Sequence, residues 1–158
     1  MNNLKSILVL AVIILTSLVS GCSEDKKSST APVESNIPQD LLGTWYYQSA
    51  TVNGVPVALS YVLQWDEGTV AARFTVGSDG SLVNEELDDN DEVVWTETGT
   101  ITIDGDNATI TITADDDGPI DPPDVLSGTW SLNDDGDELT LTGDYLGYPV
   151  IFVTVRTL

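Results

Sequence analysis

The side chains that most often perform chemistry in proteins are scarce in this sequence. It contains no histidine and one cysteine, and no lysine follows residue 27. A serine nucleophile would therefore lack a histidine or lysine base. Carboxylate pairs can act as general acid and base, but no spacing singles out one pair among the many acidic residues. The composition therefore argues against an enzyme.

Cys22 is the one residue whose chemistry the sequence identifies. Lys5 precedes an uninterrupted apolar run over residues 7–15, and Ser20 and Gly21 come directly before Cys22. This layout is typical of a secretory signal with a cleavage site, and the run is shorter than the roughly 20 residues of a membrane-spanning helix. The alternative is an ordinary signal peptide followed by an unrelated cysteine. A free thiol in an oxidising compartment would then need another explanation.

The segment Val19-Ser20-Gly21-Cys22 resembles the lipobox of bacterial lipoproteins. In that family the cysteine thiol receives a diacylglycerol, a peptidase cuts directly before it, and the new amine is often acylated. The resemblance implies that residues 1–21 are a removed signal peptide and that acyl chains on Cys22 anchor the protein to a membrane. It also implies a location in the cell envelope. Ser23, rather than Asp, after the cysteine favours the outer membrane if the cell is Gram-negative.

The rest of the chain divides into a linker and one acidic domain. Residues 22–39 are polar and serine-rich, so we expect a flexible linker after the lipidated cysteine. Residues 40–158 are long enough for a single domain with its own core. The net charge is −21, and Arg73 and Arg156 are the only basic residues beyond residue 38. This balance excludes nucleic acid as a partner and favours a soluble surface, with cation binding as the alternative.

Period-two alternation of apolar and hydroxyl residues predicts an all-β domain. It is clearest over residues 101–103, 108–113 and 139–142, as in strands with one buried face. Asn-Gly and Asp-Gly pairs near the strand ends suit tight hairpins. We expect an antiparallel meander of about eight to nine strands, with the acidic segment 115–124 as a lid or slack loop. The expected strands span 43–52, 55–65, 69–76, 81–87, 93–103 (with a break at Gly99), 108–114, 127–132, 138–143 and 149–157.

The segment LLGTWYYQSATVNG, which begins at Leu41, resembles the opening strand of lipocalin-like lipoprotein domains of bacteria. The later segments FTVGSDGSL and GTWSLNDDGDELTLTG resemble inner hairpins of the same family. The resemblance implies a closed or half-open lipocalin-like barrel. In lipocalins the Trp of the Gly-x-Trp motif packs across the closed end, and an Arg of the last strand stacks on it. Trp45 and Arg156 match this barrel-closing pair. The Thr-Asp-Tyr motif and the disulfide of true lipocalins are missing.

The function that this resemblance implies is the binding of a small apolar or amphipathic ligand. Inward aromatic residues either fill such a barrel or line its pocket, and we predict Tyr47, Trp65, Phe74 and Trp95 as pocket lining. The alternative is a non-catalytic envelope scaffold or interaction module with a filled core. A cavity of several hundred Å³ would favour ligand binding, and a solidly packed interior would favour the scaffold. The sequence does not indicate the ligand or the oligomeric state.

Three acidic clusters, at residues 88–92, 115–117 and 134–138, raise the question of a metal site. Calcium prefers oxygen ligands of this kind, but none of the clusters has the spacing of an EF-hand loop. Without histidine or a free cysteine, zinc and copper sites are excluded. We therefore predict solvated turns, no metal, and no cofactor other than the covalent lipid, with calcium on the loops as the open alternative.

Overall fold

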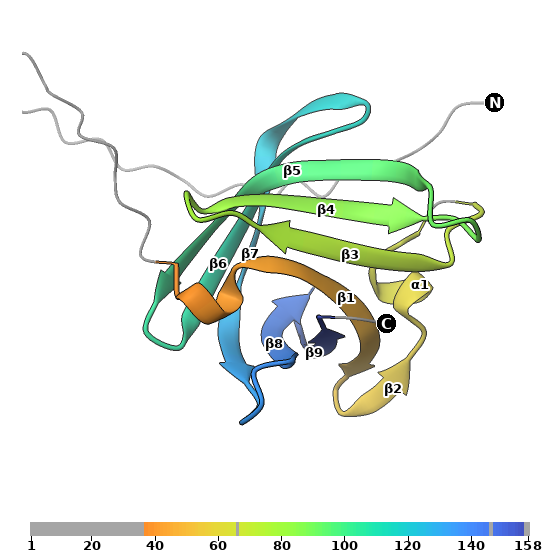
Figure 1. The fold of residues 1–158 in the computed structure, drawn as a ribbon. Helices are drawn as coiled ribbons and strands as arrows, with labels where there is room; N and C mark the ends of the chain where they lie inside the picture. Colours follow the sequence, from red (N-terminus) through yellow and green to blue (C-terminus); the bar gives the residue numbers. More distant parts are fainter. Residues whose placement is uncertain (1–36, 66, 146, 157–158) are drawn as a thin grey trace, which may run out of the picture. The chain divides into compact units, whose positions relative to one another are not determined.

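One nine-stranded antiparallel sheet dominates the described part of the chain, residues 37–65, 67–145 and 147–156 of a computed structural model (Figure 1). The signal sequence, Cys22 and most of the linker predicted above lie outside the described residues. The elements are η1 (Gln39–Leu41), β1 (Gly43–Val52), β2 (Val55–Val57), α1 (Leu59–Val62), β3 (Ala71–Val76), β4 (Ser81–Leu87), β5 (Val93–Asp104), β6 (Asn107–Asp115), β7 (Gly118–Leu132), β8 (Glu138–Tyr145) and β9 (Tyr148–Val155).

The sheet closes on itself. Its strands follow one another in the order β2-β1-β3-β4-β5-β6-β7-β8-β9, and β1 also pairs with β9 from Tyr46↔Val155 to Val52↔Val150. The eight strands other than β2 therefore form a closed barrel. The extra strand β2 pairs with the end of β1, from Ala50 to Val52. Closure removes the unpaired edges of an open sheet. The prediction of an all-β antiparallel meander that closes into a barrel is confirmed.

The expected strand over residues 55–65 is wrong in its second half. The chain leaves β2 after Val57 and forms the short helix α1, in which Val62 is buried beside Ala50 and Val150. This packing covers one side of the barrel and overrides the strand propensity of the segment. Tyr61 points away and is 77% exposed, so Tyr61, Leu63 and Trp65 do not share a strand face.

The acidic segment 115–124 is mostly strand rather than the expected loop. Asp115 accepts backbone N–H bonds from Asp117 and Gly118, which forms a tight turn, and β7 begins at Gly118. The ladder between β6 and β7 then skips residues 120–123, because its pairs run from Ala114↔Pro119 to Ile112↔Asp124. Proline cannot donate to a ladder, and this irregular stretch accommodates the prolines that suggested a loop.

Gly99 marks a shift in register rather than a break in β5. The pairing of β5 with β6 changes between Thr98 and Gly99, and the strand continues to Asp104. A Cβ atom on Gly99 would lie 2.0 Å from the carbonyl oxygen of Thr111. The close approach of the two backbones therefore requires glycine here.

Two groups of buried side chains fill the barrel. The larger group surrounds Trp45, Phe74, Leu82 and Ile101 at the end where η1 enters. The smaller group lies under α1 and joins Ala50, Val62, Val150 and Phe152. Among the described residues, no helix has the length and apolar character needed to cross a membrane.

Candidate functional site

Inward-facing side chains are packed at one end of the barrel and partly exposed at the other. Trp45, Phe74 and Leu82 are almost completely buried at the closed end. Strand pairing places a second set on the same inward face, nearer the opposite end of strands β4 to β7. These side chains are only partly buried, and we call the part of the inward face that they form the lumen. They are Asn84, Glu97, Ile110, Ile112 and Leu126.

Several carboxylate side chains lie on the same inward face as the lumen residues. Glu97 follows Trp95 on the inward face of β5, Asp115 is its cross-strand neighbour on β6, and Asp124 faces Ile112 from β7. Glu86 lies on the same face of β4, is 7% exposed and accepts a hydrogen bond of 2.6 Å from the Thr69 hydroxyl. We call Glu86, Glu97, Asp115 and Asp124 the lumen acids. They come from four neighbouring strands, so the barrel concentrates negative charge on this part of its inward face.

Glu97 is the electrostatic centre of the lumen acids. Burial raises the pKa of its carboxyl group, and the charges of Glu86, Asp115 and Asp124 raise it further. A hydrogen bond of 2.9 Å from the side-chain amide of Asn84 opposes this rise without cancelling it. The ionised form of Glu97 is therefore disfavoured in the empty barrel, and a cation placed beside it would relieve that cost.

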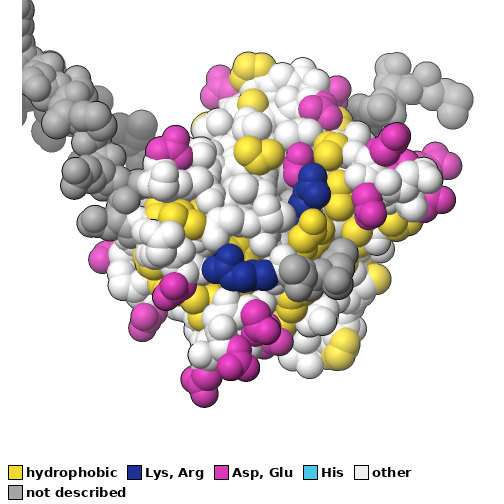
Figure 2. All heavy atoms as spheres, in the orientation of Figure 1, with side chains coloured by type: hydrophobic (Ala, Val, Ile, Leu, Met, Phe, Trp, Pro, Cys, Tyr) yellow, Lys and Arg dark blue, Asp and Glu magenta, His cyan; other side chains and the backbone are white. Residues whose placement is uncertain are grey.

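The basic side chains of the described chain do not supply this cation. Arg73 lies on the outer face of β3, where its Nε atom is 2.7 Å from Oε2 of Glu85. Arg156 lies at the closed end against Trp45. Figure 2 shows two separate basic patches on the displayed face, with acidic side chains around its margin. Among the described contacts, neither arginine bonds Glu97.

Aromatic rings form an apolar wall near Glu97. The Tyr47 ring lies 5.4 Å from that of Phe74 and 5.5 Å from that of Phe152, in tilted and edge-on contacts. Burial raises the pKa of the Tyr47 hydroxyl, and the charge of Glu97 raises it further. The hydroxyl is therefore neutral at ordinary pH. The site combines packed aromatic rings with the carboxyl group of Glu97.

The predicted pocket residues are only partly brought together. Tyr47 and Phe74 are in contact, and Trp95 lies across from Glu86 on the inward face. Trp65 follows α1 instead of a strand, and its buried indole Nε1 has no hydrogen-bond partner among the described residues. The polar residues of the lumen were missed. The alternation that places Trp95 and Ile101 inward also places Glu97 inward, and this signal could have revealed it.

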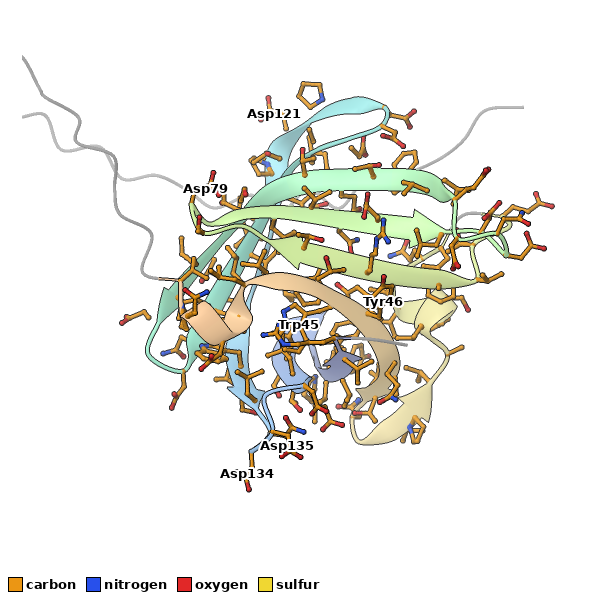
Figure 3. All side chains as sticks on the ribbon, viewed as in Figure 1. Trp45, Tyr46, Asp79, Asp121, Asp134 and Asp135 are labelled. Carbon is orange, nitrogen blue, oxygen red and sulfur yellow. The ribbon has the colours of Figure 1, made fainter. Side chains whose placement is uncertain are left out.

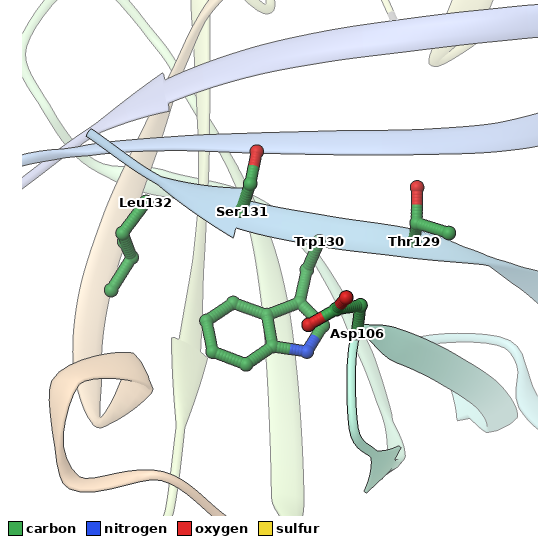
Figure 4. A pocket seen from close by; sticks show the side chains of 5 residues that line it. All are labelled: Asp106, Thr129, Trp130, Ser131 and Leu132. Carbon is green, nitrogen blue, oxygen red and sulfur yellow. The ribbon is translucent and has the colours of Figure 1, made fainter.

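Hollows in the barrel are of two kinds. An open depression of about 590 Å³ lies at the closed end, where the Trp130 indole donates a 3.0 Å hydrogen bond to the carbonyl of Gly105 (Figure 4). Asp106, Thr129, Ser131 and Leu132 complete its lining. A second hollow, lined by Ile110 and Leu126 of the lumen and by Phe152, measures about 20 Å³, which is room for about one water molecule. It is far smaller than the several hundred Å³ expected of a ligand pocket.

Trp45 and Arg156 meet at the closed end. The guanidinium carbon of Arg156 lies 4.2 Å from the centre of the Trp45 ring, whose indole N–H bonds the carbonyl of Leu41. Figure 3 shows Trp45 beneath β1. Arg156 also donates 3.0 Å hydrogen bonds to the carbonyls of Leu42 and Gly136, and a third to Asp40. One side chain thus ties η1 and the β7–β8 turn to the last strand.

Replacing Arg156 with Gln should lower the free energy of unfolding by about 1–3 kcal/mol, because the cation–π contact and the charged hydrogen bonds are lost. Urea unfolding followed by tryptophan fluorescence measures the change. Arg73→Gln is the matched control, because it removes a surface ion pair that contributes about 1 kcal/mol or less. Equal losses in the two variants would contradict a closing role for Arg156.

The acidic turn clusters serve local hydrogen bonding. Asp88 accepts backbone N–H bonds from Asn90 and Glu92, which lower the pKa of its carboxyl group. Figure 3 shows Asp134 and Asp135 at the tip of the β7–β8 turn, at the far side of the view from Asp121. Within the described residues, no group of three or more acidic side chains is arranged to hold a metal ion.

The chain matches no protein-family model, and no curated protein is significantly similar to it in sequence. Solved structures share its fold. A biogenic amine-binding protein superposes with a TM-score of 0.51 at 15% identity, over 82% of this chain and 71% of the other. The amine-binding protein of Rhodnius prolixus, in its tryptamine complex, gives a TM-score of 0.49 at 16% identity, over 87% and 72%. The likeness to the first of these structures shows a shared fold.

Proposed function

We propose that the barrel binds a small amphipathic molecule that carries an ammonium group, with its charge at Glu97 and its apolar body on the aromatic wall. The observation that carries this proposal is the position of Glu97, an inward carboxylate among like charges with neither arginine beside it. A bound ammonium would remove the cost of ionising this group. The sequence led us to expect an apolar or amphipathic ligand, and this proposal specifies an amphipathic cation.

Two further features support the proposal. The rings of Tyr47, Phe74 and Phe152 pack against one another, with Phe74 and Phe152 buried, and they give this part of the barrel an apolar character that suits an aromatic or aliphatic ligand body. The structural neighbour at a TM-score of 0.51 is described as a biogenic amine-binding protein. Binding of this kind requires no catalytic residue, in accord with the composition of the chain.

Calorimetric titration of the purified chain tests the proposal. We expect 2-phenylethylamine to bind and its neutral isostere 2-phenylethanol to bind at least about tenfold more weakly, since one charge-assisted hydrogen bond is worth about 1.5–3 kcal/mol. Equal affinity for the two compounds would show that the lumen does not recognise charge. Absence of binding by any amine would contradict the proposed function.

The affinity for the amine should fall as the pH is lowered through the raised pKa of Glu97, because protonation removes the negative charge. The fall should begin above the ordinary carboxyl pKa of about 4.3. The free energy of unfolding should instead rise as the pH is lowered through the same range. The folded state binds a proton more readily than the unfolded state, so this group costs stability as the pH rises from its ordinary pKa to its raised one. Titrations between pH 4 and pH 8 measure the affinity, and Glu97→Gln should lack this step.

The small size of the interior hollow favours a second candidate function. The hollow beside Ile110, Leu126 and Phe152 has room for about one water molecule, as expected of a scaffold or interaction module with a packed core. Such a protein would bind none of the amines. The same titration therefore separates the two candidates.

We also propose that the barrel is held at a membrane through lipid on Cys22. The arrangement of Lys5, the apolar run at residues 7–15 and the small residues before Cys22 supports this anchor. Two or more acyl chains are needed for stable attachment, at about 0.8 kcal/mol per buried methylene. The described domain has a strongly acidic surface, which anionic lipid would repel, so retention depends on the anchor.

A further inference from the structure

Asn84 presents an unused hydrogen-bond acceptor beside Glu97. Its side chain faces inward from β4, with Phe74 and Glu97 as its neighbours on the adjacent strands. The Nδ2 atom donates a 2.9 Å hydrogen bond to Oε2 of Glu97. A carboxylate accepts but does not donate, so the amide must turn its NH2 group towards Glu97. The carbonyl oxygen Oδ1 therefore points away from that bond.

This Oδ1 atom is buried and has no hydrogen-bond partner in the described part of the chain. Most buried side-chain polar atoms in proteins are paired, because an unpaired one loses its bonds to water without replacement. A ligand that donates to Oδ1 would satisfy the atom. The hydrogen bond between Asn84 and Glu97 keeps the two side chains next to each other, so one ammonium group can donate both to Oδ1 and to the carboxylate.

We propose that Asn84 makes the lumen selective for ammonium ions with at least two N–H groups, one for the Glu97 carboxylate and one for Oδ1 of Asn84. This inference rests on the proposed binding of cationic amines. A tertiary ammonium carries one N–H group and would satisfy the Glu97 carboxylate alone. The second acceptor disfavours it, because its methyl groups would leave Oδ1 of Asn84 unpaired.

Three ligands that share one aromatic body test the proposal by calorimetry: 2-phenylethylamine, its N,N-dimethyl derivative and 2-phenylethanol. We expect the full chain to bind the primary amine at least about tenfold more tightly than the dimethylammonium ion, the discrimination of one hydrogen bond at a charged site. Asn84→Leu has a similar volume and should reduce this ratio to about twofold or less. Asn107→Leu, on the exposed β5–β6 turn, is the control and should leave the ratio unchanged.

The outcomes separate this inference from the proposed function. If the wild-type chain binds both cations equally and the alcohol weakly, Asn84 does not select ligands by their number of N–H groups. The proposed recognition of charge at Glu97 would still hold. A preference that persists in Asn84→Leu would assign the discrimination to steric exclusion and overturn the inference. The ratio in the wild-type chain decides the matter alone if the variant does not fold. Failure of every cation to bind would remove the proposed function together with the inference.

Discussion

Replacing Glu97 with Gln is expected to weaken the binding of 2-phenylethylamine by about 10- to 100-fold, because a charge-assisted hydrogen bond worth about 1.5–3 kcal/mol becomes a neutral one. The binding of 2-phenylethanol should change by less than about twofold, since it carries no charge to lose. Calorimetric titration at pH 7 measures both affinities. The variant keeps the shape of the side chain and an oxygen that can accept from Asn84.

Glu85→Gln is the matched control for this substitution. Glu85 lies on the same strand as Asn84 but on the outer face, where it pairs with Arg73. If the site is the lumen, removing this outer charge should leave the affinity for the amine within about twofold, because exposed charges are screened by salt. Equal weakening by both variants would mean that the barrel attracts amines through its net charge rather than at one site.

The same Glu97 variant should not lose stability. The raised pKa of Glu97 means that its ionised form costs the fold free energy at neutral pH, and glutamine removes that cost. We expect the unfolding midpoint in urea at pH 7 to stay unchanged or to rise. A group that weakens the empty protein and strengthens the complex is a mark of a binding site. A clear fall in the midpoint would instead assign Glu97 a structural role.

Replacing Cys22 with Ser should move the protein from the membrane fraction to the soluble fraction almost completely. The substitution removes the acceptor of the diacylglycerol, and the chain has no second cysteine to replace it. Fractionation of cells followed by immunoblotting measures the distribution, and metabolic labelling with palmitate should be lost in parallel. Ser23→Ala keeps the thiol and should stay with the membrane. Continued membrane association of the Cys22→Ser chain would overturn the proposed anchor.

The sequence predicted most of the barrel because its strands carry strong local signals. Alternation over residues 108–113 and 139–142 and the Asp-Gly turns correspond to β6, β8 and their hairpins. The two largest errors in the predicted elements arose where packing or strand irregularity overrides local preference. Apolar residues at 59–63 suit a strand equally well, but α1 buries Val62 against the barrel. The prolines after Gly118 suggest a loop, but a skipped section of the ladder admits them to β7.

The candidate site was predicted from its apolar half alone. Aromatic residues at alternating positions pointed to Tyr47 and Phe74, which do meet in the barrel. The acidic residues were too numerous for any one to stand out, and composition assigned them to the surface. Only the strand register shows that Glu97, Asp115 and Asp124 converge from three neighbouring strands. The partnership of Asn84 with Glu97 depends on the pairing of β4 with β5, which alternation within one strand does not reveal.

The central claim is that a ligand cation lies against the Glu97 carboxylate, and its most direct test is the pKa of that carboxyl group with and without ligand. Carbon-detected NMR of the chain labelled at glutamate can follow the group through a pH titration. The pKa should lie above its ordinary value in the empty barrel and fall to or below that value when 2-phenylethylamine saturates the protein. An amine that binds and leaves the pKa of Glu97 where it was would contradict the claim.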